Sequence, residues 1–162
     1  MISKLSFYEL DRIIKIVNKA SIAYKGVIPT DRYKQPYLSR AEVAKEIEDG
    51  VIFFGFLKES KIIGVMGIQQ VKDVTLIRHA YVVPEYQNLG VGRSLLKHLM
   101  GLSRTKNVFV GTWQAASWAI SFYEKNGFIL VSKKEKNDLL SRYWKIPKRQ
   151  IETSVVLKYK NI

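Results

Sequence analysis

The stretch Ala80–Ser94, AYVVPEYQNLGVGRS, constrains the fold most, because one short segment predicts a strand, a turn and a helix start. An apolar β-branched run ends at Pro84, whose missing amide hydrogen closes a strand's hydrogen-bond ladder. Glycines follow at positions 90 and 92. Four apolar residues then recur at helical spacing: Leu95, Leu96, Leu99 and Met100. A helix N-terminus carries free N–H groups and partial positive charge, so the stretch predicts an anion site.

Two common phosphate loops do not fit this stretch. The chain has no GxxxxGK[ST] sequence, and Leu95 occupies the third glycine position of a dinucleotide-binding GxGxxG. The remaining pattern, Q-x-x-G-x-G after a strand ending in V-x-P, resembles the acetyl-CoA-binding signature of the GCN5-related N-acetyltransferases (GNAT). The resemblance implies that the backbone of Val82 and Val83 holds the pantetheine arm of the coenzyme. The residues that it implies at the diphosphate are Gln87, Asn88, Leu89, Gly90, Val91, Gly92, Arg93 and Ser94.

A second segment, Ser117–Phe128 (SWAISFYEKNGF), resembles the family's helix ending in F-Y-E-K-x-G-F. The resemblance implies that Tyr123 lies near the coenzyme sulfur and protonates the departing thiolate as a general acid. A phenol with a pKa of about 10 protonates a thiolate whose thiol has a pKa of about 8.5 only if the geometry is favourable. The alternative is an aromatic at the edge of a core-facing helix. The family often has an asparagine seven residues before this tyrosine; here that position is Ala116, and Gln114, Ser117 or backbone would replace it.

The family often uses a glutamate on one of two splayed strands to deprotonate the amine, and these strands correspond to 74–83 and 107–113. The second has no carboxylate, and the first offers only Arg78 and His79. Imidazoles titrate near neutral pH, so His79 is the predicted base. The alternative is a histidine satisfied within the sheet or facing away from the cleft. His98 falls off the apolar face of its predicted helix and is expected to be solvated.

No residue is expected to form a covalent acetyl-enzyme. Cysteine is absent, and Ser94 is not in a G-x-S-x-G turn, so direct attack in a ternary complex is predicted. No metal site is expected, because the two histidines lie 19 positions apart and form no ligand cluster. The acceptor pocket is expected to use aromatic residues, although such residues are also common in a core. The candidates are Tyr24, Tyr33, Tyr37, Trp113 and Tyr143.

The apolar patterns predict an ordered series of elements. Expected strands are 2–5, 51–57, 61–71, 74–83, 107–113, 128–132 and 154–159; expected helices are 8–20, 39–49, 91–104 and 115–126; and 133–138 is expected to be a polar loop. Ser39 and Glu42 form a predicted capping box. This order is mixed α/β and matches the GNAT layout over nearly the whole chain. It implies one acyl-CoA N-acyltransferase domain spanning 1–162, with a mixed, mostly antiparallel sheet and helices on both faces.

Composition limits the classes of partner. No apolar run reaches the roughly 20 residues of a membrane span, and no signal peptide is seen, so a cytoplasmic protein without membrane contact is expected. The formal net charge is +13. The basic residues form no obvious helical stripe or aromatic platform, so nucleic-acid binding is not favoured. The scarcity of carboxylates argues against a polycationic amine. A homodimer is left open.

The sequence therefore predicts an acetyl-CoA-dependent N-acetyltransferase acting on a primary amine, with a small-molecule acceptor favoured over a peptide amine. The alternatives are a protein N-terminal or lysine acetyltransferase, a non-catalytic acyl-CoA-binding module, and a nucleic-acid-associated module.

Overall fold

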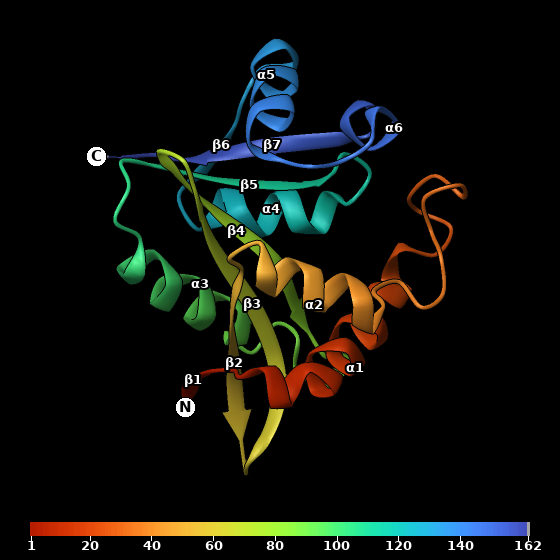
Figure 1. Cartoon of the computed structure of the whole chain (residues 1–162), viewed down its shortest axis with the longest axis vertical. Coiled ribbons are helices and arrows are strands. Elements are labelled where there is room, and N and C mark those ends of the chain that lie inside the picture. Colours follow the sequence, from red (N-terminus) through yellow and green to blue (C-terminus); the bar gives the residue numbers. More distant parts are fainter. Residues whose placement is uncertain (162) are drawn as a thin grey trace.

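The computed structural model describes residues 1–161 and is built on a seven-stranded sheet (Figure 1). The strands are β1 (Ile2–Lys4), β2 (Ile52–Lys58), β3 (Lys61–Val71), β4 (Val74–Val82), β5 (Asn107–Trp113), β6 (Phe128–Leu130) and β7 (Ser154–Tyr159). Their order across the sheet is β1-β2-β3-β4-β5-β7-β6. Every neighbouring pair is antiparallel except β4 and β5, which are parallel. The predicted mixed, mostly antiparallel sheet is confirmed.

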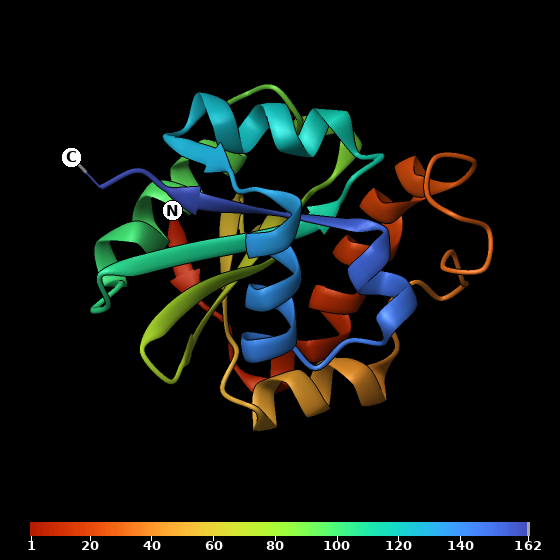
Figure 2. The ribbon, with the colours of Figure 1, turned by 90° about the horizontal axis from the view of Figure 1, so that it is seen from above.

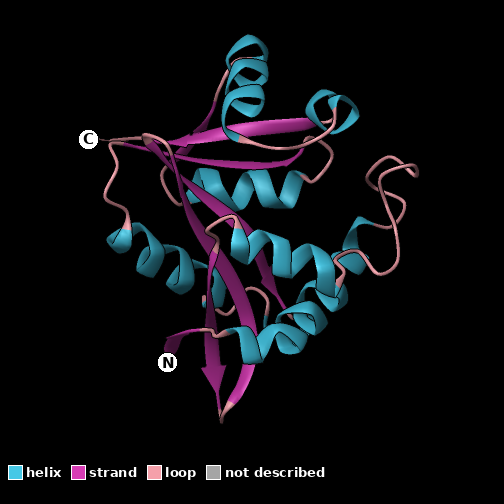
Figure 3. Cartoon of the chain, viewed as in Figure 1, coloured by secondary structure: helices cyan, strands magenta, loops and turns pink. Residues whose placement is uncertain are grey.

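Helices cover both faces of this sheet (Figures 2 and 3). They are α1 (Leu10–Ala20), α2 (Arg40–Glu48), α3 (Val91–Leu102), α4 (Ser117–Lys125), α5 (Lys133–Tyr143) and α6 (Lys148–Glu152), with short 3-10 helices η1 (Phe7–Glu9), η2 (Ser21–Tyr24) and η3 (Pro84–Tyr86). Alternate strand residues point to opposite faces. Phe53 and Val65 therefore pack in the cluster under α1 and α2, while Phe54 and Met66 pack under α3 and α4. None of the helices in 1–161 is long and apolar enough to cross a bilayer.

Local sequence signals account for several boundaries. The predicted capping box at the start of α2 is present: Glu42 N donates to Ser39 Oγ at 3.2 Å, and Ser39 N donates to Glu42 Oε2 at 2.7 Å. The helix α1 begins at Leu10, two residues later than predicted, because a 3-10 turn precedes it. β6 ends at Leu130 rather than at Ser132.

The predicted polar loop at 133–138 is wrong, because these residues begin the helix α5. Ser132 caps this helix by accepting a hydrogen bond from Glu135 N at 3.2 Å. Its buried residues, Lys136, Leu140 and Tyr143, follow four- and three-residue steps that the surrounding charges concealed. Lys136 is buried with its charge against a carbonyl, donating to Ile151 O at 2.7 Å. The short helix α6 was not predicted either.

The sheet is interrupted at one place, along β4. Gly67 pairs with Arg78 and Val65 with Tyr81, so β4 carries one extra residue against β3. His79 lies in this bulge with a positive φ of 52°. The ladder between β4 and β5 runs only from Val74 and Asn107 to Ile77 and Val110. Beyond Ile77 the edge of β4 that faces β5 therefore has no strand partner among residues 1–161.

Candidate active site

The predicted anion loop lies between η3 and α3, with residues 87–90 exposed to solvent. Gly90 occupies the N-cap of α3 with φ +84°, a conformation that side chains disfavour. No side chain caps this helix, and the first helical bond runs from Ser94 N to Gly90 O at 2.9 Å. The amides of Val91, Gly92 and Arg93 consequently have no intrahelical partner. This terminus fits a diphosphate, because it offers free N–H groups and the positive end of the helix dipole.

The loop is held close to neighbouring elements. A Cβ at Gly92 would lie 3.4 Å from two ring atoms of Phe122, so glycine lets the start of α3 approach α4. Gln87 Nε2 donates to Val82 O at 2.9 Å and ties the loop to the end of β4. Asn88 has a positive φ of 62°, which asparagine tolerates better than most residues. Leu89, Arg93 and Ser94 are exposed, whereas Val91 is buried in the core.

The two valines carried over from the family signature differ in their backbone contacts. Val83 N donates to Ile63 O at 3.0 Å, and Val83 O accepts from Tyr86 N at 2.9 Å, so both of its groups already have partners. Successive residues of an antiparallel strand direct their backbone groups to opposite edges. Those of Val82 therefore face the open edge of β4. Val82 O already accepts from Gln87 Nε2, so its N–H is the group through which an extended ligand could pair as an additional strand.

Tyr123 lies on α4 with its ring buried between two phenylalanines. The centroid distances are 5.1 Å to Phe122 and 5.6 Å to Phe128. Burial raises the pKa of Tyr123 well above its ordinary value of 10, and the proximity of Tyr24 raises it further. The phenol is therefore protonated at neutral pH, so in acid–base chemistry it can act as a proton donor and not as a base. At the start of α4, Ser117 is exposed, while Ala116 is fully buried and supplies no capping side chain.

A second feature is a cavity of about 140 Å³ where β4 and β5 part. His79, Tyr24, Tyr37 and Trp113, which were predicted separately, all line it. The other lining residues are Ile77, Arg78, Tyr81, Gly111, Thr112, Leu140, Trp144, Ile146, Gln150 and Ser154. We call this space the aromatic cavity. Its lining residues come from η2, the segment before α2, both parted strands, the α5–α6 region and the first residue of β7.

The aromatic cavity is fixed by contacts among its own walls. Trp113 Nε1 donates to the Tyr37 hydroxyl at 2.8 Å, and the Tyr24 and Tyr37 ring centroids lie 5.3 Å apart. Burial raises the pKa of Tyr24, Tyr37 and Tyr81, so all three phenols are neutral at neutral pH. The lining contains no aspartate or glutamate. The cavity therefore offers aromatic faces and neutral hydroxyls, together with the cationic Arg78.

Two predicted acceptor residues lie outside this cavity. Tyr33 does not line it, although its ring centroid lies 6.4 Å from that of Tyr37. Tyr143 belongs to the cluster between α5 and β5, where its ring stacks near Phe109 and its hydroxyl donates to Asp73 Oδ1 at 2.9 Å. Neither side chain is therefore placed to contact a molecule in the aromatic cavity. His98 is exposed, as predicted.

His79 belongs to a buried ionic cluster with Glu46 and Arg78. The Nε2 atom of His79 is occluded from solvent and makes no well-aligned hydrogen bond within residues 1–161. It lies 3.3 Å from Glu46 Oε2. The other carboxylate oxygen accepts from Arg78 at 3.0 Å, and Arg78 also donates to Gln69 Oε1 at 2.9 Å. Burial alone would raise the pKa of Glu46, but the neighbouring His79 and Arg78 outweigh it and lower the pKa below the ordinary value. Glu46 is thus an anion held beside the imidazole.

Glu46 is not among the residues predicted from the sequence, because the family pattern implies a carboxylate on one of the two splayed strands and Glu46 lies on neither. The residue lies on α2 and reaches β4 through tertiary packing. One feature of the sequence indicates that Glu46 faces the sheet. It follows the buried Val43 by three residues, which places both on the same face of the helix.

Known proteins with an acetyltransferase domain resemble this chain. The family model for the acetyltransferase (GNAT) domain matches residues 49–130, just over half of the chain. A spermidine N(1)-acetyltransferase from Thermoplasma acidophilum is 23% identical over 139 residues, which cover 78% of this chain and 86% of that protein.

Solved structures share the fold. The PaiA N-acetyltransferase from Thermoplasma acidophilum, in complex with coenzyme A, superposes with a TM-score of 0.75 at 20% identity and covers 99% of this chain and 98% of its own. The ribosomal-protein-S18-alanine N-acetyltransferase from Escherichia coli has a TM-score of 0.69 at 18% identity, with 98% and 92% covered.

Proposed function

Because the chain belongs to the GNAT family of acetyltransferases, we propose that it transfers an acetyl group to a small primary amine held in the aromatic cavity. Membership makes the protein an N-acetyltransferase that uses acetyl-CoA. The bound coenzyme supplies an activated acetyl thioester. One observation supports this placement of the site: β4 and β5 part beyond Ile77 and Val110, and residues of both strands past this point line the aromatic cavity.

The chain's own groups would hold the coenzyme at two points. The free amides of α3, reached through the Gln87–Gly90 loop, bind the diphosphate, with Arg93 and Ser94 at the rim. The N–H of Val82 pairs with the pantetheine arm along the open edge of β4, while Val82 O holds Gln87. Ser117, exposed at the start of α4, takes the role of the asparagine that other members of the family have at the position of Ala116.

Two proton transfers complete the reaction. The Tyr123 hydroxyl donates its proton to the departing sulfur. Burial raises the phenol's pKa and makes it a weaker acid, so this transfer depends on the hydroxyl lying directly beside the departing sulfur, where the same dry surroundings disfavour a free thiolate. His79 Nδ1 accepts the proton that the attacking amine loses, because the Glu46 carboxylate 3.3 Å from Nε2 favours a hydrogen on that nitrogen. Glu46 fixes this tautomer and stabilises the imidazolium.

The walls of the aromatic cavity favour a compact amine with an apolar or aromatic body. A polycation such as spermidine needs carboxylates along its length, and the cavity lining has none. Arg78, although paired with Glu46, adds positive charge at the base of the cavity. A peptide amine is the competing acceptor. We also propose a single domain, since one sheet takes strands from Ile2 through Tyr159. A cytoplasmic location stays a prediction.

The test is release of free coenzyme A thiol from acetyl-CoA across a panel of acceptors. The panel contains small aromatic and aliphatic monoamines, spermidine, and peptides with a free N-terminal alanine. We expect turnover with monoamines and a lower kcat/KM for spermidine. Turnover with the peptides and with no small amine would indicate that the acceptor is a protein amine. Coenzyme binding by calorimetry without turnover on any acceptor would indicate a non-catalytic module.

A further inference from the structure

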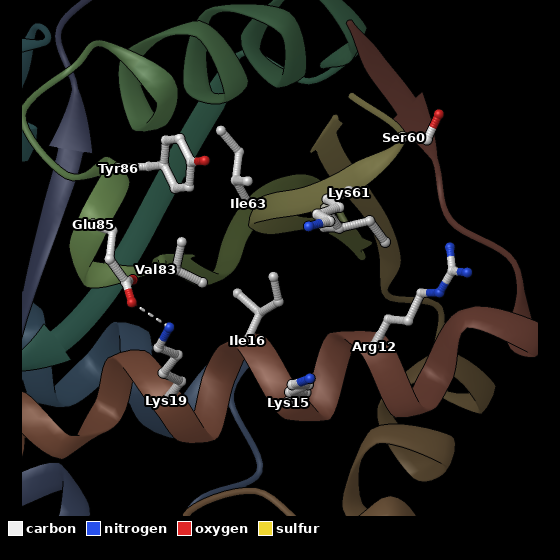
Figure 4. Close-up of a pocket in the computed structure, with 11 residues that line it drawn as sticks. Arg12, Lys15, Ile16, Lys19, Ser60, Lys61, Ile63, Val83, Glu85 and Tyr86 are labelled. Carbon is white, nitrogen blue, oxygen red and sulfur yellow. Dashed lines mark hydrogen bonds and ion pairs between the residues drawn. The ribbon is translucent and has the colours of Figure 1, made fainter. Parts of the chain in front are cut away.

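A basic groove of about 630 Å³, larger than the aromatic cavity, lies between α1, the start of β3 and η3 (Figure 4). It shares no lining residue with the aromatic cavity. Its lining residues are Arg12, Lys15, Ile16, Lys19, Ser60, Lys61, Ile62, Ile63, Val83, Glu85 and Tyr86. A volume of this size falls within the range of about 300–1,000 Å³ that holds small organic ligands.

The charges in this basic groove are arranged on two sides. Arg12, Lys15 and Lys19 follow one another at three- and four-residue steps, so they project from the same face of α1. Lys61 faces them from β3 (Figure 4). The prediction that basic residues form no helical stripe is therefore wrong for α1. With a rise of about 1.5 Å per residue, the row on α1 extends about 10 Å.

Most of this charge is not neutralised inside the protein. Lys19 pairs with Glu85 at 2.5 Å. Arg12, Lys15 and Lys61 have no ion-pair partner among the residues that the structure describes. Three like charges around one recess repel each other, and an anion placed between them would relieve that repulsion.

The floor of the basic groove is apolar. Ile63 is buried, and Ile62, Val83 and Tyr86 are half-buried around it. A hydrated inorganic ion would leave this floor uncovered, whereas an organic anion would cover it and gain hydrophobic contact. We propose that the basic groove binds a small organic polyanion, with two or more phosphate, sulfonate or carboxylate groups on an apolar body. The anionic groups contact Lys15 and Arg12 on one side and Lys61 on the other.

The experiment uses protein saturated with coenzyme A, so that the end of α3 is blocked. Calorimetry compares naphthalene-1,5-disulfonate, which has two anionic groups on an apolar body, with naphthalene-1-sulfonate and with inorganic sulfate. We expect the disulfonate to bind most tightly. Lys15→Glu and Lys61→Glu should each weaken it about tenfold or more, because each variant removes a charge-assisted contact and adds repulsion. Lys134→Glu, an equal charge change on the exposed face of α5, should change affinity less than about twofold.

Several results would overturn the proposal. One is equal affinity for the disulfonate and sulfate, and another is equal weakening by all three charge reversals, which would indicate unspecific attraction to a cationic protein. Disulfonate binding that is seen without coenzyme A but is absent in the saturated protein would place the disulfonate at the coenzyme site instead of the basic groove. Arg12→Glu serves in place of either lysine variant if thermal unfolding shows that variant to be misfolded. Acetyl transfer plays no part in these measurements, so a failure of the proposed function leaves them interpretable.

Discussion

Replacing Glu46 with glutamine is expected to slow acetyl transfer through His79 while leaving coenzyme binding intact. The carboxylate lies 3.3 Å from the imidazole, and both side chains are mostly buried, with 24% and 16% exposed. Two unit charges at this distance interact by about 5 kcal/mol at an effective dielectric of about 20, and by about 1 kcal/mol in bulk water. We take an intermediate value, a loss of about 2 kcal/mol of transition-state stabilisation, which corresponds to a fall of about 30-fold in kcat.

The assay is thiol release with the best amine of the panel, followed at varied acetyl-CoA and varied amine. Because Glu46 does not contact the Gln87–Gly90 loop, KM for acetyl-CoA should stay within about twofold of the unaltered protein. Glu48→Gln is the matched control: it removes the same charge from an exposed position of α2 and should change neither parameter. Circular dichroism at the assay temperature establishes that both variants are folded.

A double-mutant cycle separates a positioning role from a direct one. His79→Asn removes the imidazole with a residue that tolerates the positive φ at this position. If Glu46 acts through His79, adding Glu46→Gln to this variant should cost less than about twofold in kcat. A full 30-fold loss in the His79→Asn background would refute the reasoning, as would an unchanged kcat in Glu46→Gln alone.

Other contacts of the site can be tested separately. Tyr123→Phe keeps the ring packing and removes the proton donor, so kcat should fall at least about 100-fold with coenzyme A affinity unchanged; undiminished turnover would exclude Tyr123 from the mechanism. Gly90→Ala places a side chain at φ +84° and should cost about 1–2 kcal/mol of stability and weaken coenzyme A binding, whereas Gly101→Ala within α3 should be neutral or stabilising by thermal unfolding. Trp113→Phe removes the hydrogen bond to the Tyr37 hydroxyl, so KM for the amine should rise while KM for acetyl-CoA does not; the reverse pattern would place the amine elsewhere. The pKa of Glu46 is lowered by folding, so its contribution to stability is present above its ordinary pKa of 4.5 and is lost as the pH falls through the lower folded value; Glu46→Gln should flatten this acid limb in chemical denaturation, and an unchanged limb would contradict the assignment.

The sequence determined those features that depend on residues near one another in the chain. Pro84 ends the hydrogen-bonding run of a strand, Gly90 supplies a positive φ, and the apolar spacing from Leu95 sets the face of α3. Each of these acts within a few positions, so the strand, turn and helix could be predicted without knowing what surrounds them. The capping box of α2 is local in the same way.

Tertiary structure alone decided which of these local elements meet. Glu46 and Arg78 lie 32 positions apart, and no spacing rule links a helix residue to the strand on which the helix packs. Beyond Val110, β5 leaves β4 while its other edge goes on pairing with β7, which comes from the far end of the chain. The basic groove likewise joins α1 to β3 and η3. The anion loop could therefore be predicted from its own residues. The pairing of Glu46 with His79, the aromatic cavity and the basic groove instead result from long-range packing, in which burial and charge depend on partners distant in sequence.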